Sequence, residues 1–225
     1  MIKRLFVLIA CEESQAECKA FRRYGHIAFS CDIQPCAKSG VPGWHIHGDV
    51  SPLCSGKTSF FTQDGKFHSV PRWDLIIAHP PCTYLCKVGS PWLYKDADFS
   101  IVWEGKNIRV NRDRWYSLIK ARSFFMKCLN SATQFVAVEN PCPMKIAQLP
   151  RPNAFACPSW FGSKYTKKTY YWLRGLPPLF AEFINTDTKC LVYCSRGKYR
   201  SRTYPGLADA IARQWGAYIL DNINH

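Results

Sequence analysis

The sequence has no long apolar stretch and little negative charge. No apolar run approaches the roughly 20 residues that a membrane-spanning helix needs, and residues 1–10 are too short for a secretion signal. Among the 225 residues, 30 Lys and Arg stand against 16 Asp and Glu, a formal net charge of +14. We therefore expect a cytoplasmic protein with a polyanionic partner, because an excess of positive charge attracts phosphate groups.

The 12 cysteines include no Cys-x-x-Cys pair, the spacing that usually anchors a zinc site. In a cytoplasmic chain, cysteines are reduced or bind metal. Cys190 and Cys194 could join other Cys and His side chains around zinc, but without that anchor we predict no metal site. The composition is 47% hydrophobic, which excludes a disordered chain, and the length fits one domain over residues 1–225.

One apolar run ends in two prolines and a cysteine. Residues 75–78 read Leu-Ile-Ile-Ala and predict a buried strand, and Pro80 and Pro81 then force the chain out of the sheet. Cys82 is therefore expected at the C-terminal edge of a strand, where open α/β sheets bind their ligands. A thiol on such a stiff loop is a candidate nucleophile. The alternative is a packed structural cysteine.

A second apolar run, residues 135–138, ends in Glu139, Asn140 and Pro141. A carboxylate at the tip of a buried strand is either partly desolvated for chemistry or a cap of the next turn. Because Cys82 and Glu139 both follow strand ends, we expect the two side chains to share one cleft.

Strands and helices are predicted to alternate along the chain, which indicates an α/β fold with a mainly parallel sheet and helices on both faces. The expected strands are residues 2–10, 27–32, 73–78, 134–138, 169–173 and 189–193, and the expected helices are residues 14–24, 112–129 and 204–220. Ser14 is the expected N-cap of the first helix. Residues 51–72 and 86–111 are expected to be long loops, which in a compact domain are often lids or substrate loops.

These motifs resemble those of the DNA cytosine-C5 methyltransferases, especially the small methylase-like proteins of phages. The Pro-Cys loop that carries the nucleophile in that family matches Pro81 and Cys82, and its Glu-Asn-Val motif is similar to Glu139-Asn140-Pro141. The resemblance implies a Rossmann-like fold that binds S-adenosylmethionine, with Cys82 as the nucleophile and Glu139 as the acid. It also implies the host cell cytoplasm as the location if the protein is phage-encoded.

The resemblance further implies a set of cofactor-binding residues, which fall in the family's order along the chain. Cys11 and Glu12 occupy the place of the first cofactor loop, and Asp32 and Ile33 occupy the place of the ribose-binding acid. Asp49 and Val50 occupy the place of the adenine motif, and Pro80 lies in the loop that carries the nucleophile. Asp209 lies in residues 204–212, a stretch that is similar to the terminal helix motif.

The chain departs from the family pattern at three places. Residues 11–15 contain no glycine, whereas the family's first loop is glycine-rich. The family's Gln-x-Arg-x-Arg motif is absent, and Lys168 or Arg202 could supply its cation near the O2 atom of the base. Only residues 177–199 stand where the family carries a large target-recognition domain, so we expect weak sequence specificity.

The expected function is S-adenosylmethionine-dependent methylation of cytosine C5 in DNA. The Cys82 thiolate attacks C6, and Glu139, a carboxylic acid bonded to N3, takes up the charge that this attack pushes onto the base. The missing recognition domain keeps open a nucleotide-level pyrimidine C5-modifying enzyme. A catalytically inactive nucleic-acid-binding relative is the alternative from a different class. The expected partner is DNA or a cytosine nucleotide, no membrane contact is expected, and a monomer is favoured.

Overall fold

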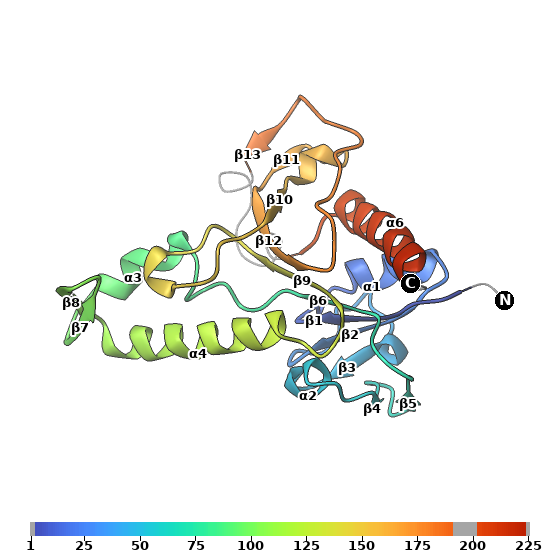
Figure 1. Cartoon of the computed structure of the whole chain (residues 1–225), viewed down its shortest axis with the longest axis horizontal. Coiled ribbons are helices and arrows are strands. Elements are labelled where there is room, and N and C mark those ends of the chain that lie inside the picture. The colour runs from blue at the N-terminus through green and yellow to red at the C-terminus, as the bar shows by residue number, and fades with distance from the viewer. Residues whose placement is uncertain (1–2, 191–201, 224–225) are drawn as a thin grey trace.

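Short apolar runs of the sequence form the centre of a seven-stranded sheet (Figure 1) in the computed structural model, which describes residues 3–190 and 202–223. The strand order is β10-β12-β9-β6-β1-β2-β3. The strands are β1 (Phe6–Ala10), β2 (Ile27–Asp32), β3 (His45–His47), β6 (Leu75–Ala78), β9 (Phe135–Asn140), β10 (Ala154–Ala156) and β12 (Thr169–Arg174). Every residue of β6 is buried, as expected of a strand that is covered on both faces.

The sheet is mainly parallel. β1 pairs in parallel with β2 and β6, β2 with β3, and β6 with β9, whereas β12 runs antiparallel to both β9 and β10. The order reverses direction at β1, from which β2 and β3 extend to one side and β6 and β9 to the other. This is the Rossmann-like arrangement that the sequence predicted. In such sheets the ligand crevice lies at the C-terminal strand ends beside the reversal.

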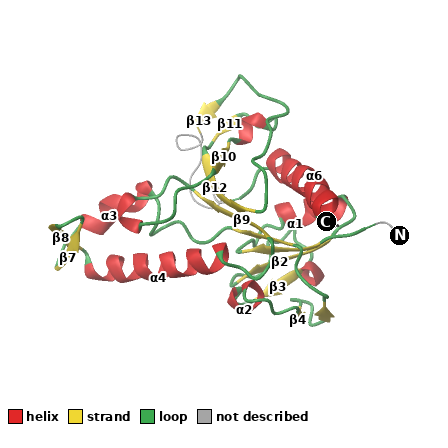
Figure 2. Cartoon of the chain, viewed as in Figure 1, coloured by secondary structure: helices red, strands yellow, loops and turns green. Residues whose placement is uncertain are grey.

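Helices cover both faces of the sheet (Figure 2). Alternate residues of β1 face opposite sides: Val7 and Ile9 pack with α1 (Ala16–Arg23) and α6 (Pro205–Asn222), whereas Leu8 and Ala10 pack with α2 (Ser51–Cys54) and α4 (Arg112–Leu129). This two-sided burial follows from the period of two residues along a strand. Within the described part of the chain, no helix combines the length and apolarity required to cross a membrane.

The segments 51–72 and 86–111, which were expected to be long loops, contain regular structure. The first holds α2 and the hairpin β4 (Ser59–Phe61) and β5 (Phe67–Ser69); the second holds η2 (Lys87–Gly89), α3 (Ser90–Tyr94), β7 (Phe99–Trp103) and β8 (Lys106–Val110). Between β7 and β8, Glu104 and Gly105 both have positive φ, 48° and 74°. Two such residues form the tight turn whose twist suits a hairpin.

The other short elements are η1 (Pro42–Trp44), η3 (Lys145–Ala147), η4 (Pro158–Trp160), β11 (Tyr165–Thr166) and β13 (Lys189–Cys190). The predicted helix at residues 112–129 is confirmed, as is the strand at residues 27–32. The predicted strand at residues 189–193 begins as β13, and its last three residues lie outside the described part of the chain.

Candidate functional site

The parallel strands bring most of the predicted site residues to one edge of the sheet. Cys11 and Glu12 follow β1, Asp32 ends β2, and Asp49 and Val50 follow β3. Pro80 and Cys82 follow β6, and Glu139 is the penultimate residue of β9. The loops interlock at this edge, because the backbone N–H of Glu12 donates to Cys31 at 3.2 Å and that of Gly48 donates to Asp32 at 2.9 Å. These positions therefore face one crevice.

The loop that carries Cys82 is fixed at both ends. At its start, the backbone N–H of His79 donates to the carbonyl of Ala10 at 2.9 Å. After Cys82 the chain makes a helical turn, in which the N–H of Cys86 donates to the carbonyl of Cys82 at 3.0 Å. The next residue is tied to the segment after β9, since the N–H of Lys87 donates to Cys142 at 2.9 Å. The cysteine loop and the strand that carries Glu139 are thus held together.

Cys82 is half-buried and lies beside a second thiol. A hydrogen bond with Cys86, followed by burial, raises the pKa of Cys82, and the same hydrogen bond lowers the pKa of Cys86 to about 6. The negative charge of Glu139 also raises the pKa of Cys82, whereas Lys167 lowers it. Because β6 and β9 are adjacent parallel strands, Cys82 and Glu139 lie at the same end of the sheet.

Glu139 faces a histidine that is itself held by another carboxylate. His79 Nδ1 lies 3.6 Å from Glu139 Oε2, and His79 Nε2 lies 3.1 Å from Oε2 of Glu17, a fully buried residue of α1. Burial alone would lower the pKa of His79, but Glu17 and Glu139 outweigh it and raise that pKa well above its ordinary value. The hydroxyl of Thr203 donates to Glu17 Oε1 at 3.0 Å. The cluster connects α1, β6, β9 and the segment before α6.

Two cations complete the pocket around Glu139. Burial raises the pKa of Glu139, yet His79, Lys167 and Thr169 together bring it below its ordinary value. Lys167 and Arg202 line the pocket with His79 and Glu139, and the cavity measures only about 20 Å³. Such a volume accommodates about one water molecule, so the pocket has to widen before a base can enter.

The structure directs Lys168 away from this pocket, in contrast to the sequence-based expectation. Its Nζ lies 4.1 Å from the ring centroid of Phe155 and 5.2 Å from that of Tyr170. The reason is that neighbouring residues of an extended segment point in opposite directions. Lys167 lines the pocket in place of Lys168, and Arg202 lines it as well.

Asn140, which follows Glu139, is fully buried. Within the described residues, its amide nitrogen and oxygen have no hydrogen-bond partner, and neither has the buried Nε of Arg202. A buried polar group without a hydrogen-bond partner costs free energy, and a new hydrogen bond would recover that cost.

The loop after β1, residues 11–15, contains no glycine. The carboxylates of Asp32 and Asp49 lie close enough to Cys11 to raise its pKa further, after burial as the main cause. Cys11 and Gln15 adopt φ of 60° and 59°, which is the left-handed conformation that glycine favours. The loop thus takes a glycine-like path without glycine. Beside this turn, Asp32 is half-buried and Asp49 is exposed.

The carboxylate of Glu12 caps a helix, which differs from the cofactor contact that the resemblance implied. This carboxylate is buried and accepts the backbone N–H groups of Glu17 at 2.7 Å and Cys18 at 3.3 Å. These are orphan donors of the first turn of α1, so Glu12 caps this helix from outside it, while Gln15 and not Ser14 occupies the N-cap position. Burial and the nearby Glu17 raise the pKa of Glu12 to about 8.

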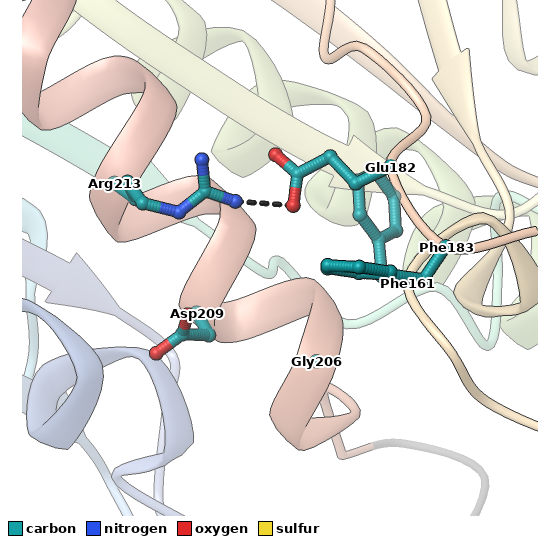
Figure 3. Close-up of a pocket in the computed structure, with 6 residues that line it drawn as sticks. All are labelled: Phe161, Glu182, Phe183, Gly206, Asp209 and Arg213. Atoms are coloured by element: carbon teal, nitrogen blue, oxygen red, sulfur yellow. Dashed lines mark hydrogen bonds and ion pairs between the residues drawn. The ribbon is translucent and has the colours of Figure 1, made fainter.

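Asp209 lies apart from the crevice. It pairs with Arg23 at 3.1 Å and accepts the hydroxyl of Tyr24 at 2.9 Å, at the far end of α1. Figure 3 shows Asp209 on α6, bordering a different cavity of about 390 Å³ that also contains the ion pair of Glu182 with Arg213. Of the remaining cofactor candidates, Val50 and Pro80 are buried, and Ile33 is 70% exposed.

Sequence reasoning missed two residues of the site, His79 and Glu17, and it chose Lys168 as the cation where the structure has Lys167. His79 directly precedes the Pro-Pro-Cys motif, and Lys167 directly precedes Lys168, so each was one position from a predicted residue. Nothing in the sequence marked Glu17 as a site residue. An acidic residue in the first turn of a helix usually lies at the surface, where it interacts favourably with the helix dipole.

No protein-family model and no curated protein matches this chain. Among solved structures, a prophage-encoded protein of E. coli described as a DNA modification methyltransferase is 14% identical, with a TM-score of 0.41 over 75% of this chain and 46% of its own. The Dnmt2 methyltransferase of S. pombe is 13% identical, with a TM-score of 0.40 over 84% of this chain and 53% of its own. A DNMT2 mutant from Spodoptera frugiperda is 12% identical, with a TM-score of 0.36 over 76% of this chain and 50% of its own.

The chain thus spans about half the length of these solved structures. At such identities and TM-scores, a function has to be argued from the side chains of the site.

Proposed function

We propose that this protein is an S-adenosylmethionine-dependent DNA cytosine-C5 methyltransferase, built as one catalytic domain. The observation that supports it most is that Cys82 and Glu139 lie at the ends of the adjacent parallel strands β6 and β9, with the cysteine loop tied to the segment after β9 by the hydrogen bond from the Lys87 N–H to Cys142 at 2.9 Å. A thiol, a carboxyl group and a cation at adjoining strand ends are the groups that covalent activation of a pyrimidine requires.

Each side chain has a distinct role in this proposal. The C5 atom of cytosine is a poor nucleophile, and addition of the Cys82 thiolate to C6 makes C5 enamine-like. The addition drives charge toward N3 and O2. Glu139 handles the proton at N3, and Arg202 or Lys167 stabilises the charge at O2, because both cations line the pocket with Glu139. Cys86 accepts the proton of Cys82.

The cofactor would lie against the ends of β1, β2 and β3. Asp32 would accept hydrogen bonds from its ribose and Asp49 from its adenine, with Cys11, Ile33, Val50 and Pro80 as walls. S-adenosylmethionine supplies an electrophilic methyl group when bound. Glu12 and Asp209 are left out of this set, because their carboxylates cap α1 and pair with Arg23.

A nucleotide-level C5-modifying enzyme is the second candidate, and one observation favours it. Only residues 175–204 separate β12 from α6, so little chain is available there for reading duplex sequence. The net charge of +14 favours DNA, because a single nucleotide does not require so large a field.

Trapping with a suicide substrate tests the proposal. Wild-type protein, labelled cofactor and an oligonucleotide containing 5-fluorocytosine should give a covalent adduct by mass spectrometry. Cys82→Ser should give none, because a serine hydroxyl has no comparable anion near neutral pH, while Cys157→Ser, a change at another half-buried thiol, should react normally. An adduct that persists in Cys82→Ser would refute the nucleophile. Label found only in free cytidine nucleotide would favour the second candidate.

A further inference from the structure

His79 directly follows β6, and its side chain makes contacts that the end of the strand does not require. Its imidazole lies between two carboxylates, with Nε2 3.1 Å from Glu17 and Nδ1 3.6 Å from Glu139. A neutral imidazole can donate from only one of its two nitrogens, so a ring that faces a carboxylate on each side is matched to the imidazolium form. The histidine side chain is 13% exposed and that of Glu17 is 0% exposed, so solvent screens this arrangement little.

Glu139 alone is poorly suited to supply a proton. It faces His79 and Lys167 and is hydrogen-bonded with Thr169, and these contacts favour its carboxylate form over the effect of burial. The proposed reaction nevertheless requires a proton at N3 when the thiolate adds to C6. The imidazole of His79 lies beside Glu139, with Nδ1 3.6 Å from Oε2.

We propose that His79 is the proton reservoir of Glu139: the imidazolium, held in place by Glu17, supplies the proton that Glu139 passes to the pyrimidine base and later takes back. This inference rests on the proposed function. His79 is a positioning residue in this scheme, since it acts through Glu139 and does not touch the base.

The proton that N3 takes up during the addition returns to His79 at the end of the cycle. As the bond between Cys82 sulfur and C6 forms, the C5–C6 double bond opens and N3 takes a proton from Glu139, which is replenished from His79. After C5 has been methylated and has lost its own proton to water, the C6–S bond breaks. The electron pair returns to sulfur, and the N3 proton returns through Glu139 to the imidazole.

Several titratable and charged groups surround His79, and of the two carboxylates beside it only Glu139 lines the pocket. From α1 it faces Glu17, and from the loop before α1 it lies in the field of Glu12, whose pKa is raised by burial and by Glu17. From β9 it faces Glu139. Across the pocket lie two cations, Lys167 and Arg202, and two phenols, Tyr171 and Tyr204. The cations favour the carboxylate of Glu139 and do not accept a proton.

The pH dependence of single-turnover methylation tests the relay. Loss of the His79 proton should set the alkaline limb of the wild-type profile. His79→Gln removes the reservoir, so Glu139 must carry the proton itself. The rate near pH 8 should fall by about 10²-fold or more, and the optimum should move to lower pH. Glu17→Gln leaves the imidazole in place and should move the alkaline limb down as well. His68→Gln, which alters a histidine of β5 outside the site, should keep the wild-type profile.

The outcomes separate the relay from the proposed function. A wild-type protein that modifies neither DNA nor nucleotide overturns both. An active wild type whose profile is parallel to that of His79→Gln, displaced by a constant factor, overturns the relay alone. The ring protons of His79, followed by NMR, give a reading that does not depend on activity: they should titrate above pH 6.5 in wild type and lower in Glu17→Gln. A His79 that titrates at or below 6.5 in wild type also overturns the relay.

Discussion

Replacing Glu17 with glutamine should reveal how strongly the buried charge cluster holds the fold. The carboxylate is fully buried and contacts His79 at 3.1 Å and the Thr203 hydroxyl at 3.0 Å. Glutamine keeps the shape and one acceptor but removes the charge. Breaking a buried ion pair at one partner typically costs 3–5 kcal/mol. We expect about 3 kcal/mol here, the lower end, because Glu139 still faces the other nitrogen of His79.

The cost should depend on pH through His79. The pKa of this histidine is raised in the folded protein, mainly by Glu17 against the effect of burial. A raised pKa contributes stability that is fully present below the unfolded value near 6.5 and is lost as the pH rises through the folded value. Glu17→Gln should therefore destabilise most at about pH 6 and much less at about pH 9.5.

Urea unfolding at the two pH values measures this difference. At pH 6 the midpoint should fall by roughly 1 M or more, given slopes of about 1–3 kcal/mol/M for small proteins. In a His79→Gln background the same substitution should cost less than about 1 kcal/mol, since the charge that Glu17 balances is gone. An equal cost at both pH values, or an unchanged cost in that background, would refute the assignment of the ion pair.

Three further outcomes follow from the site. Lys167→Ala should slow methylation by at least about tenfold, and Lys168→Ala should have a much smaller effect in the same assay, because Lys168 lies over Phe155; the reverse ranking would contradict the orientation of the two lysines. Asp32→Ala should weaken cofactor affinity in calorimetry, and an unchanged affinity would remove the ribose assignment. Binding to duplex DNA should fall steeply with salt, about 0.9 in the log–log slope per neutralised phosphate. A flat response would favour the free nucleotide.

The sheet could be predicted from the sequence because its central strands are buried on both faces. Such burial requires an uninterrupted apolar run, and residues 27–32 and 75–78 show one. The prolines after Ala78 and Asn140 also mark where the strands end. The short edge strands β3 and β10 were missed, since three residues carry too little pattern. The β7–β8 hairpin had a usable signal, the Glu104-Gly105 turn between two runs of alternating polarity.

The contacts inside the site could be predicted only in part. Cys82 and Glu139 lie at the ends of adjacent parallel strands, so their proximity follows from the fold class. Glu17 and His79 are separated by 62 positions in the sequence, and their contact depends on how α1 packs against the sheet. The choice between Lys167 and Lys168 depends on the phase of a short extended segment, which composition does not reveal.

The small volume of the pocket identifies the wall that must move when a base enters. The wall formed by His79 and Glu139 is fixed, because the backbone of His79 is bonded to β1 and Glu139 belongs to a central strand. The opposite wall contains Arg202, Thr203 and Tyr204, which precede α6. Displacing that wall breaks the hydrogen bond from Thr203 to Glu17. Glu17 then has His79 as its remaining side-chain partner among these contacts, so the entry of a base is coupled to the Glu17–His79 pair.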